Sequence, residues 1–360
     1  MLNNPKIIFE IGNSSIKLIE MSYERAKDKV MLKNCSIIPL SDSSTRGNIN
    51  VNTDIISSLI KSEVKKKGIK VKEAMGVISG EGIISRDVLI PKMSEHEIDK
   101  KIREESSLYI PVDVANYVID YKIMNDIQTE EGPKTKIYIV AVPHKMVDTY
   151  VEIASKCGFI LEAIDINGNA FSKLLLLEMK NRNELPVEND AIVGLDIGAK
   201  DTYIVFIQNG IFQFSREINF GCNELINILS ENLSLPFEKA EEELRVNSKK
   251  YLNFNENLPS MDEETALINE YMLKKLNIFV NELNKIISFY KGRYLCRDIT
   301  RIYIAGGTSN IEDLDEFIKN NTHLECSKLS QLKCLQNGTK DQLSNEFLSL
   351  ANVIGTSIRE

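Results

Sequence analysis

Apolar and polar positions along the chain follow two periods, and together they predict an α/β protein. Short apolar runs that end in glycine or polar turns predict strands at residues 7–11, 74–79, 191–195 and 301–305. Apolar residues three or four positions apart predict helices at residues 54–64, 170–179 and 263–291. The last helix places Ile268 and Tyr290 on one apolar face. Because a coiled coil would keep a stricter heptad, we expect this face to pack into a core.

Two predicted hairpins share one pattern, in which an acidic residue, an isoleucine and a glycine follow a buried strand. They contain residues Glu10 to Gly12 and Asp196 to Gly198. A glycine without a Cβ lets the backbone N–H groups of a turn approach a phosphate, and the carboxylate can hold the water shell of Mg²⁺. For a single hairpin, the alternative is an aspartate that only caps its own turn. The second copy favours two similar domains that face one cleft.

A third element fits the same cleft. The strand at residues 301–305 is broken by Gly306 and Gly307, and residues 308–310 offer caps for a helix over residues 311–319. Paired glycines there would let an adenine and a ribose lie against the backbone. Alone, such a corner is common in α/β proteins.

These three elements resemble the phosphate-1, phosphate-2 and adenosine motifs of the actin, sugar kinase and heat-shock chaperone ATPase superfamily. Within it, the chain resembles the PilM family of type IV pilus assembly, which is similar to the division protein FtsA. The most specific parts are residues 78–80, 85–121 with Tyr109-Ile110-Pro111, and 214–218. The resemblance runs nearly end to end. It implies an α/β, actin-like (ribonuclease H-like) two-domain ATPase fold with an inserted α+β subdomain 1C.

The resemblance also implies a division of the chain into three parts. Residues 1–84, 161–188 and 335–360 would form actin-like domain 1 (1A), residues 85–160 the inserted subdomain 1C, and residues 189–334 domain 2 (2A/2B). The pattern within the insertion agrees, because a capping box at Ser94 and Glu97 opens a helix between predicted strands. Two more strands follow, and Pro143 and Gly158 bound a second helix.

The cofactors implied by the resemblance are ATP and Mg²⁺. Glu10 and Asp196 are the expected metal contacts. The expected nucleotide contacts are Glu10, Gly12, Asn13, Ser14, Ser15, Lys17, Asp196, Gly198, Ala199, Lys200, Gly306, Gly307 and Thr308. For Lys17, the alternative is a solvent-facing strand residue.

Two positions depart from the family pattern. Glu10 stands where an aspartate is usual, and the extra methylene moves the carboxylate by about 1.5 Å. Asp313 stands where glycine is common. We therefore expect ATP binding, with hydrolysis weak or absent. Asp165 is the catalytic candidate, because the superfamily often places an acidic or amide residue there, near the attacking water. The alternative, a helix cap shared with Asn167 and Asn169, stays open.

The composition of the chain limits its possible binding partners and its expected cellular location. The chain has 360 residues, 43% of them apolar, and a net charge of −8, which argues against a nucleic-acid binder and against direct binding to anionic lipids. No apolar run has the length of a membrane span, and no signal peptide is evident, so we expect a cytoplasmic protein. The six cysteines are scattered, which predicts reduced thiols rather than a metal site.

The function implied by the resemblance is an ATP-binding scaffold at the inner face of the cell membrane. It would bind the cytoplasmic N-terminal tail of a PilN-like membrane protein and link it to the pilus motor. Contact with the motor ATPase and a homo-oligomer are left open. The expected peptide contacts are Arg86, Glu104, Tyr109, Ile110 and Pro111, with an ordinary core role as the alternative for Ile110.

Two other functions remain as alternatives. One is a filament-forming division protein like FtsA, disfavoured because the sequence lacks a basic amphipathic tail at residue 360. The other is a small-molecule kinase of the same superfamily, disfavoured by the insertion at Ser85 and the short length.

Overall fold

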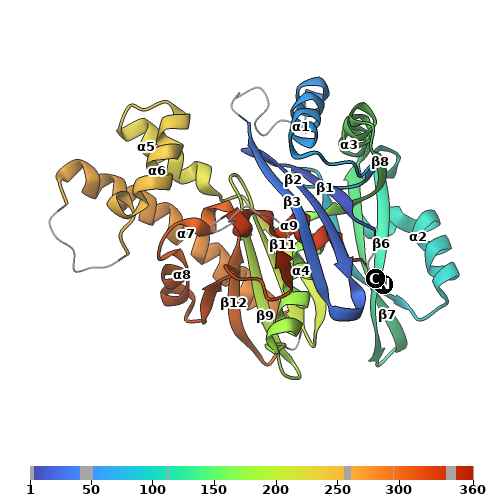
Figure 1. Ribbon diagram of the computed structural model, residues 1–360. Coiled ribbons are helices and arrows are strands. Elements are labelled where there is room, and N and C mark those ends of the chain that lie inside the picture. The colour runs from blue at the N-terminus through green and yellow to red at the C-terminus, as the bar shows by residue number, and fades with distance from the viewer. Residues whose placement is uncertain are drawn as a thin grey trace.

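The described residues form three β-sheets, and helices cover the faces of these sheets (Figure 1). The computed structural model describes residues 4–40, 52–111, 113–254, 261–294, 296–337 and 346–359. Within these residues, no helix is both long enough and apolar enough to cross a membrane.

The first sheet has six strands in the order β14-β3-β2-β1-β4-β8. These are β1 (Lys6–Ile11), β2 (Ser15–Glu24), β3 (Lys29–Pro39), β4 (Glu73–Ile78), β8 (Ile160–Ile166) and β14 (Leu335–Asn337). The first three form an antiparallel meander, whereas β4, β8 and β14 pair in parallel. One face packs against α1 (Thr53–Lys67) and α3 (His144–Cys157). The other face packs against α4 (Asn167–Arg182) and α9 (Ala351–Ser357).

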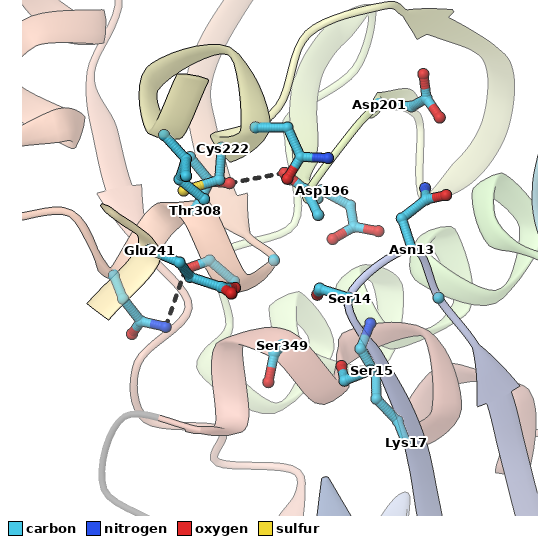
Figure 2. A pocket seen from close by; sticks show the side chains of 18 of the residues that line it. Asn13, Ser14, Ser15, Lys17, Asp196, Asp201, Cys222, Glu241, Thr308 and Ser349 are labelled. Atoms are coloured by element: carbon cyan, nitrogen blue, oxygen red, sulfur yellow. Dashed lines mark hydrogen bonds between the residues drawn. The ribbon is translucent and has the colours of Figure 1, made fainter. Parts of the chain in front are cut away.

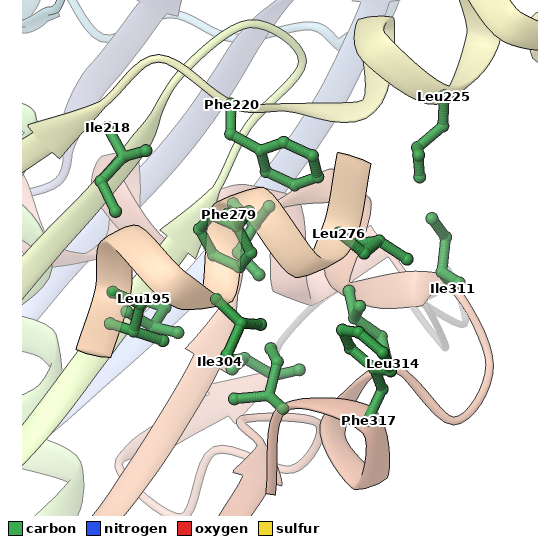
Figure 3. Close-up of a cluster of buried hydrophobic side chains, with 14 of the residues drawn as sticks. Leu195, Ile218, Phe220, Leu225, Leu276, Phe279, Ile304, Ile311, Leu314 and Phe317 are labelled. Atoms are coloured by element: carbon green, nitrogen blue, oxygen red, sulfur yellow. The ribbon is translucent and has the colours of Figure 1, made fainter. Parts of the chain in front are cut away.

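The second sheet has five strands in the order β11-β10-β9-β12-β13. These are β9 (Asp190–Ile197), β10 (Thr202–Gln208), β11 (Ile211–Ile218), β12 (Asp298–Ala305) and β13 (Cys326–Lys328). Side chains from one face, including Ile192 and Val205, join the core around α4, so α4 lies between the two large sheets. The other face packs against α7 (Glu263–Arg293) and α8 (Leu314–Thr322), as the Leu195, Phe279 and Ile304 side chains show in Figure 3.

Two further helices extend the second half beyond its sheet. These are α5 (Cys222–Asn232) and α6 (Phe237–Tyr251), which pack against each other and against α7. Apolar side chains such as Leu225 and Leu276 join them to the same core (Figure 3). In Figure 1, α5 and α6 stand above the sheet at the side away from α2.

The small sheet has the order β5-β7-β6, from β5 (Ile84–Pro91), β7 (Gly132–Pro143) and β6 (Tyr117–Thr129). Helix α2 (Glu95–Tyr109) covers one face and begins with the predicted capping box: the Ser94 Oγ accepts from the Glu97 N–H, and the Glu97 carboxylate accepts from the Ser94 N–H. The described residues also form four short 3-10 helices: η1 (Arg25–Lys27), η2 (Val114–Asn116), η3 (Gly307–Asn310) and η4 (Glu346–Leu350).

Some element boundaries differ from the sequence-based expectations. Helix α8 begins at Leu314 rather than Ile311, because a 3-10 turn over 307–310 and a left-handed Asp313 (φ 59°) come first. Helix α7 continues through Gly292 to Arg293. Helix α6 extends to Tyr251, although the polar stretch at residues 248–260 predicts a loop. Residues 41–50, a polar segment that predicts a surface loop, lie outside the described residues.

Candidate functional site

A cavity opens where the two predicted hairpins and the Gly306-Gly307 turn converge (Figure 2). The β1–β2 hairpin forms one wall, the β9–β10 hairpin forms the wall opposite, and the end of β12 closes the floor. All of the predicted nucleotide contacts except Lys200 line it: Glu10, Gly12, Asn13, Ser14, Ser15, Lys17, Asp196, Gly198, Ala199, Gly306, Gly307 and Thr308.

Three charged groups meet in this cavity: two buried carboxylates and a partly buried lysine. Glu10 and Lys17 are directly opposite on β1 and β2, and the Lys17 Nζ lies 3.0 Å from the Glu10 Oε1. Asp196, only 5% exposed, comes from β9, and Figure 2 shows Lys17 rising toward it. Burial raises the pKa of both carboxyl groups, with the Lys17 ammonium opposing that shift. The two carboxylates outweigh burial at Lys17 and raise its pKa.

One oxygen of this cluster has no partner among the described residues. The Glu10 side chain is 3% exposed, and its Oε2 makes no hydrogen bond. A buried carboxylate oxygen without a donor is costly, so its presence at a cavity wall indicates a ligand that would satisfy it. The described part of the chain holds no group of three or more acidic, cysteine or histidine side chains suited to a metal. A cation here would therefore need ligands from elsewhere, and Mg²⁺ commonly takes them from phosphate oxygens and water.

The two hairpin turns close in the same way. The Gly12 N–H donates to the Ser15 carbonyl at 2.9 Å, and the Gly198 N–H donates to the Asp201 carbonyl at 3.0 Å. A Cβ on Gly198 would lie 2.9 Å from that carbonyl oxygen, so the turn has little room for a side chain. The repeat seen in the sequence is thus a repeat of local geometry.

The Gly306-Gly307 turn, which forms the floor of the cavity, packs closely against the β9–β10 hairpin. Gly306 has a left-handed φ of 89°, and a Cβ there would lie 2.3 Å from the Ile197 carbonyl oxygen. The Thr308 Oγ1 donates to the Gly198 carbonyl at 2.7 Å. Glycine at position 306 is therefore required both by its backbone angle and by the closeness of β9.

Several residues of the cavity were not predicted. Glu241, Arg245 and Ser248 line it from α6, and Asn223 and Ile226 line it from α5. The α6 residues share one helix face, since they are four and three positions apart, but a polar stripe on a helix usually faces solvent. Only the fold brings this stripe to the cavity.

Asn352 on α9 was also missed. Its Nδ2 donates to the Asp196 Oδ2 at 2.7 Å, and its side chain is 1% exposed. The sequence signal would have been a single asparagine among the apolar residues of the last helix. This bond orients the Asp196 carboxylate from the far end of the chain.

Asp165, the catalytic candidate, is not among the residues that line this cavity. Its Oδ1 accepts from the Asn169 Nδ2 at 2.8 Å, and its Oδ2 lies 2.7 Å from the Lys173 Nζ. Helix α4 begins after Ile166 without a side-chain cap bond, so these contacts are an amide hydrogen bond and an ion pair rather than a helix cap. Asn167 is the residue of this segment that reaches the cavity, and its Oδ1 has no partner among the described residues.

The remaining predicted residues are scattered. Lys200 points to the Glu81 Oε1, 2.6 Å away, instead of into the cavity.

Of the predicted peptide contacts, Arg86 lines a second cavity, near Tyr203 and Glu217. Ile110 is fully buried in the core of the small sheet, so its side chain cannot meet a peptide in this conformation. Glu104 is exposed on α2, and Tyr109 packs against that core. Pro111 is exposed just beyond the end of α2.

A third cavity, of about 600 Å³, lies between the small sheet and α4. Asp120 and Lys122 of β6 line one side, and Lys173 and Leu176 of α4 line the other. Arg25, Lys180 and Arg359 are further cations of the lining, and Asp165, paired with Lys173, is a further carboxylate.

Comparison with known proteins places these features in a family. A family model described as "Type IV pilus assembly protein PilM" matches residues 9–360. A solved "PilM-PilN type IV pilus biogenesis complex" has a TM-score of 0.80 at 18% identity, covering 98% of this chain and 97% of that one. The ethanolamine utilization protein EutJ from Carboxydothermus hydrogenoformans has a TM-score of 0.55 at 13% identity, covering 99% and 89%. MreB5 of Spiroplasma citri bound to ADP has a TM-score of 0.52 at 12% identity, covering 98% and 94%. These likenesses show the actin-like fold expected from the sequence.

Proposed function

Because this chain belongs to the PilM family of type IV pilus assembly proteins, we propose that it is a nucleotide-binding scaffold that anchors a PilN-like membrane protein. The observation that carries the nucleotide half is the buried Glu10 oxygen without a partner, beside Lys17 and Asp196 at a cavity built from two glycine hairpins. That combination suits a phosphate chain with its cation.

In this proposal the bound nucleotide is ATP with Mg²⁺. Backbone groups of the two turns other than the Gly12 and Gly198 N–H, which close the turns, would approach the phosphates. Lys17 would neutralise the phosphates, and Glu10 and Asp196 would contact the hydrated cation. The Gly306 turn and the α6 face carrying Glu241 and Arg245 would hold the nucleoside. Mg²⁺ would supply charge neutralisation on the phosphates.

We also propose that turnover is slow. A base must reach the attacking water, and the Asp165 carboxylate is instead held by Asn169 and Lys173. Asn167 does reach the cavity, but an amide orients water without taking its proton. Binding without rapid hydrolysis suits a scaffold whose state depends on nucleotide occupancy.

Calorimetry with Mg-ATP tests the nucleotide proposal. Asp196→Ala and Gly198→Val should each weaken binding by tenfold or more, because one removes a cation contact and the other fills the turn. Asp298→Ala is the matched control, since Asp298 lies on the same sheet but is exposed and pairs with Lys291. Unchanged affinity in both cavity variants would remove the assignment.

For the partner, we propose that the tail of a PilN-like protein enters the cavity between β6 and α4. β6 is an edge strand of the small sheet, so an extended peptide can pair with its free backbone groups. Exposed Val118 and Ile123 on β6 offer apolar contacts, and Lys122 and Asp120 offer charges of both signs. The protein would then be peripheral to the membrane through this partner.

We propose the same three domains for this chain as the resemblance implies. They are domain 1 (residues 1–84, 161–188 and 335–360), subdomain 1C (residues 85–160) and domain 2 (residues 189–334). The three sheets support this division to within a residue, because the small sheet covers Ile84 to Pro143 and the first sheet resumes with β8 at Ile160.

Fluorescence anisotropy with a labelled tail of the organism's own PilN-like protein tests the groove. Lys122→Glu should weaken binding by about tenfold, whereas Lys100→Glu on the far face of α2 should not. Arg86→Glu and Tyr109→Ala probe the surface first expected from the sequence. If those two weaken binding and Lys122→Glu does not, the tail binds elsewhere. Wild-type protein that ignores the peptide would contradict the partner proposal.

A further inference from the structure

Helix α7 carries an apolar stripe on the side opposite its buried face. The buried face includes Met272, Leu276 and Leu283, which pack into the second core. On the other side, Leu267 is 43% exposed, Tyr271 42%, Ile278 57% and Phe289 50%. Isolated exposed apolar residues are ordinary, but four large ones aligned on one helix are not.

The alignment follows from the spacing. Leu267, Ile278 and Phe289 are separated by eleven positions each, a period that keeps side chains on one line of a nearly straight helix. At 3.6 residues per turn, these three and Tyr271 fall within an arc of roughly 40°, along about 33 Å of helix. Lys274, Glu282 and Lys285 interleave with them and are exposed.

The stripe is symmetric about Ile278. Leu267 and Phe289 are each eleven residues from it, Tyr271 and Lys285 seven, and Lys274 and Glu282 four. We propose that a second copy of this chain packs on α7 with the helices antiparallel and the two Ile278 side chains facing each other. Leu267 of each copy then meets Phe289 of the other, and Lys274 meets Glu282.

Charge complementarity selects a second copy over another partner. Within one helix, Lys274 and Glu282 are eight residues apart, too far for an ion pair, and no ion pair in the described part of the chain involves either. In the antiparallel dimer, Lys274 of each copy meets Glu282 of the other, so two pairs of opposite charges form. It also brings Lys285 to the ring of Tyr271, a cation–π contact. A parallel pairing would oppose like charges.

The helix pair is a small interface. Its two faces bury on the order of 1,000 Å², at the low end for specific association, so the dimer should be weak, with a dissociation constant in the micromolar range. Sedimentation equilibrium of the full-length protein between about 1 and 300 μM measures it. A protein that stays monomeric throughout would overturn the proposal.

Variants locate the interface. Ile278→Glu should weaken dimerisation at least tenfold with an unchanged far-ultraviolet circular dichroism spectrum. Lys70→Glu, at an exposed lysine before β4, is the control for the change in net charge and should still dimerise. If Ile278→Glu dimerises like wild type, the interface is elsewhere and the proposal fails.

Charge reversal then tests the antiparallel register. Lys274→Glu alone and Glu282→Lys alone each oppose like charges in their own dimers and should dimerise more weakly than wild type. Mixed together, the two variants form a heterodimer in which both contacts again join opposite charges, so association should recover. If each single variant dimerises weakly and the mixture of the two does not associate more tightly, the antiparallel pairing is excluded.

Discussion

Glu10 and Lys17 form the most consequential pair of residues in the cavity. The antiparallel register makes them direct neighbours; the Glu10 side chain is nearly inaccessible to water, and the Lys17 side chain is 15% exposed. A buried carboxylate with one oxygen on an ammonium and the other unpaired is costly in the free protein. A cation or phosphate that reorganises this pair would relieve that cost, which favours the bound state.

Lys136 gives a prediction on pH. Its ammonium donates to the Gln213 carbonyl at 3.0 Å, joining β7 to β11, and burial lowers its pKa to about 8, with Asp87 opposing and Arg293 adding to the shift. Between about pH 8 and 10.5 the unfolded chain holds the proton that the folded chain has released. Stability due to this group therefore rises with pH across that window.

The comparison is with Lys136→Met, which cannot titrate. The free energy of unfolding of the wild type minus that of the variant should increase by on the order of 3 kcal/mol from pH 8 to 10.5. Urea denaturation at several pH values measures the difference, from which other titrating groups cancel. A difference that falls with pH would contradict the assigned direction.

Glu178 gives a second prediction at this scale. It is 0% exposed, its Oε1 lies 2.6 Å from the Arg182 Nε, and its carboxylate accepts from the Lys333 and Cys334 N–H groups at 2.8 Å. Glu178→Gln places an amide N–H against those donors and should cost about 3 kcal/mol in chemical denaturation. Glu242→Gln, which alters an exposed pair with Arg245, is the control and should cost under about 0.5 kcal/mol.

Sequence reasoning reached cavity residues whose neighbours are local and missed those whose neighbours are distant. The Glu10, Gly12 and Lys17 group follows from one hairpin, because strand pairing puts these residues opposite each other. Asn352 reaches Asp196 from 156 positions away, and no local pattern marks it. Asp165 was undecided between two roles, since both use a carboxylate at a helix start.

At the scale of elements, α4 and α9 cross with their backbones almost touching. A Cβ on Gly355 would lie 1.9 Å from the Ala170 carbonyl oxygen. Gly355→Ala should therefore push α9 away, costing roughly 1–3 kcal/mol of stability. It should also weaken Mg-ATP binding, because Asn352 on α9 orients Asp196.

Gly292→Ala is the matched control for that prediction. Nothing lies within 4 Å of a Cβ at Gly292, which is also in a helix. It should leave binding unchanged and stabilise the protein by up to about 1 kcal/mol. If Gly355→Ala behaves like Gly292→Ala, the two helices are less closely packed than described.

Elements were predictable where periodicity was strong, and boundaries were not. The buried face of α7 follows from spacing alone, but its second apolar stripe was hidden within the same spacing, because a helix with apolar residues on two sides resembles one with a broad apolar face. The start of α8 depended on the left-handed Asp313, a conformation that no propensity for aspartate requires.

At the scale of the whole molecule, polar contacts join the two halves of the chain beside the cavity. Lys200 of the second half meets Glu81, and the Gly80 N–H donates to the Tyr203 hydroxyl at 3.3 Å. The walls of the cavity come from both halves. A ligand bound between them should tie the halves together.

Thermal unfolding measures this effect. At a Mg-ATP concentration one hundred times the dissociation constant, binding should stabilise the folded protein by about 2.7 kcal/mol and raise its melting temperature. Asp196→Ala at the same concentration should show a much smaller rise. An equal rise in both proteins would mean that the nucleotide binds outside this cavity.

Strand β14 and helix α9 also bear on how the protein is made. All five strands of the second sheet lie between residues 190 and 328. The first sheet is completed only when β14, which begins at residue 335, pairs with the edge of β3, and its core also needs Ile354 of α9. A ribosome adding about 5–20 residues per second needs roughly 15–60 s between these partners. The second half can therefore fold on the emerging chain while the meander of the first half still exposes an open edge. Nascent chains halted before α9 would lack Asn352, and with it a completed cavity, so incomplete products should not compete for nucleotide.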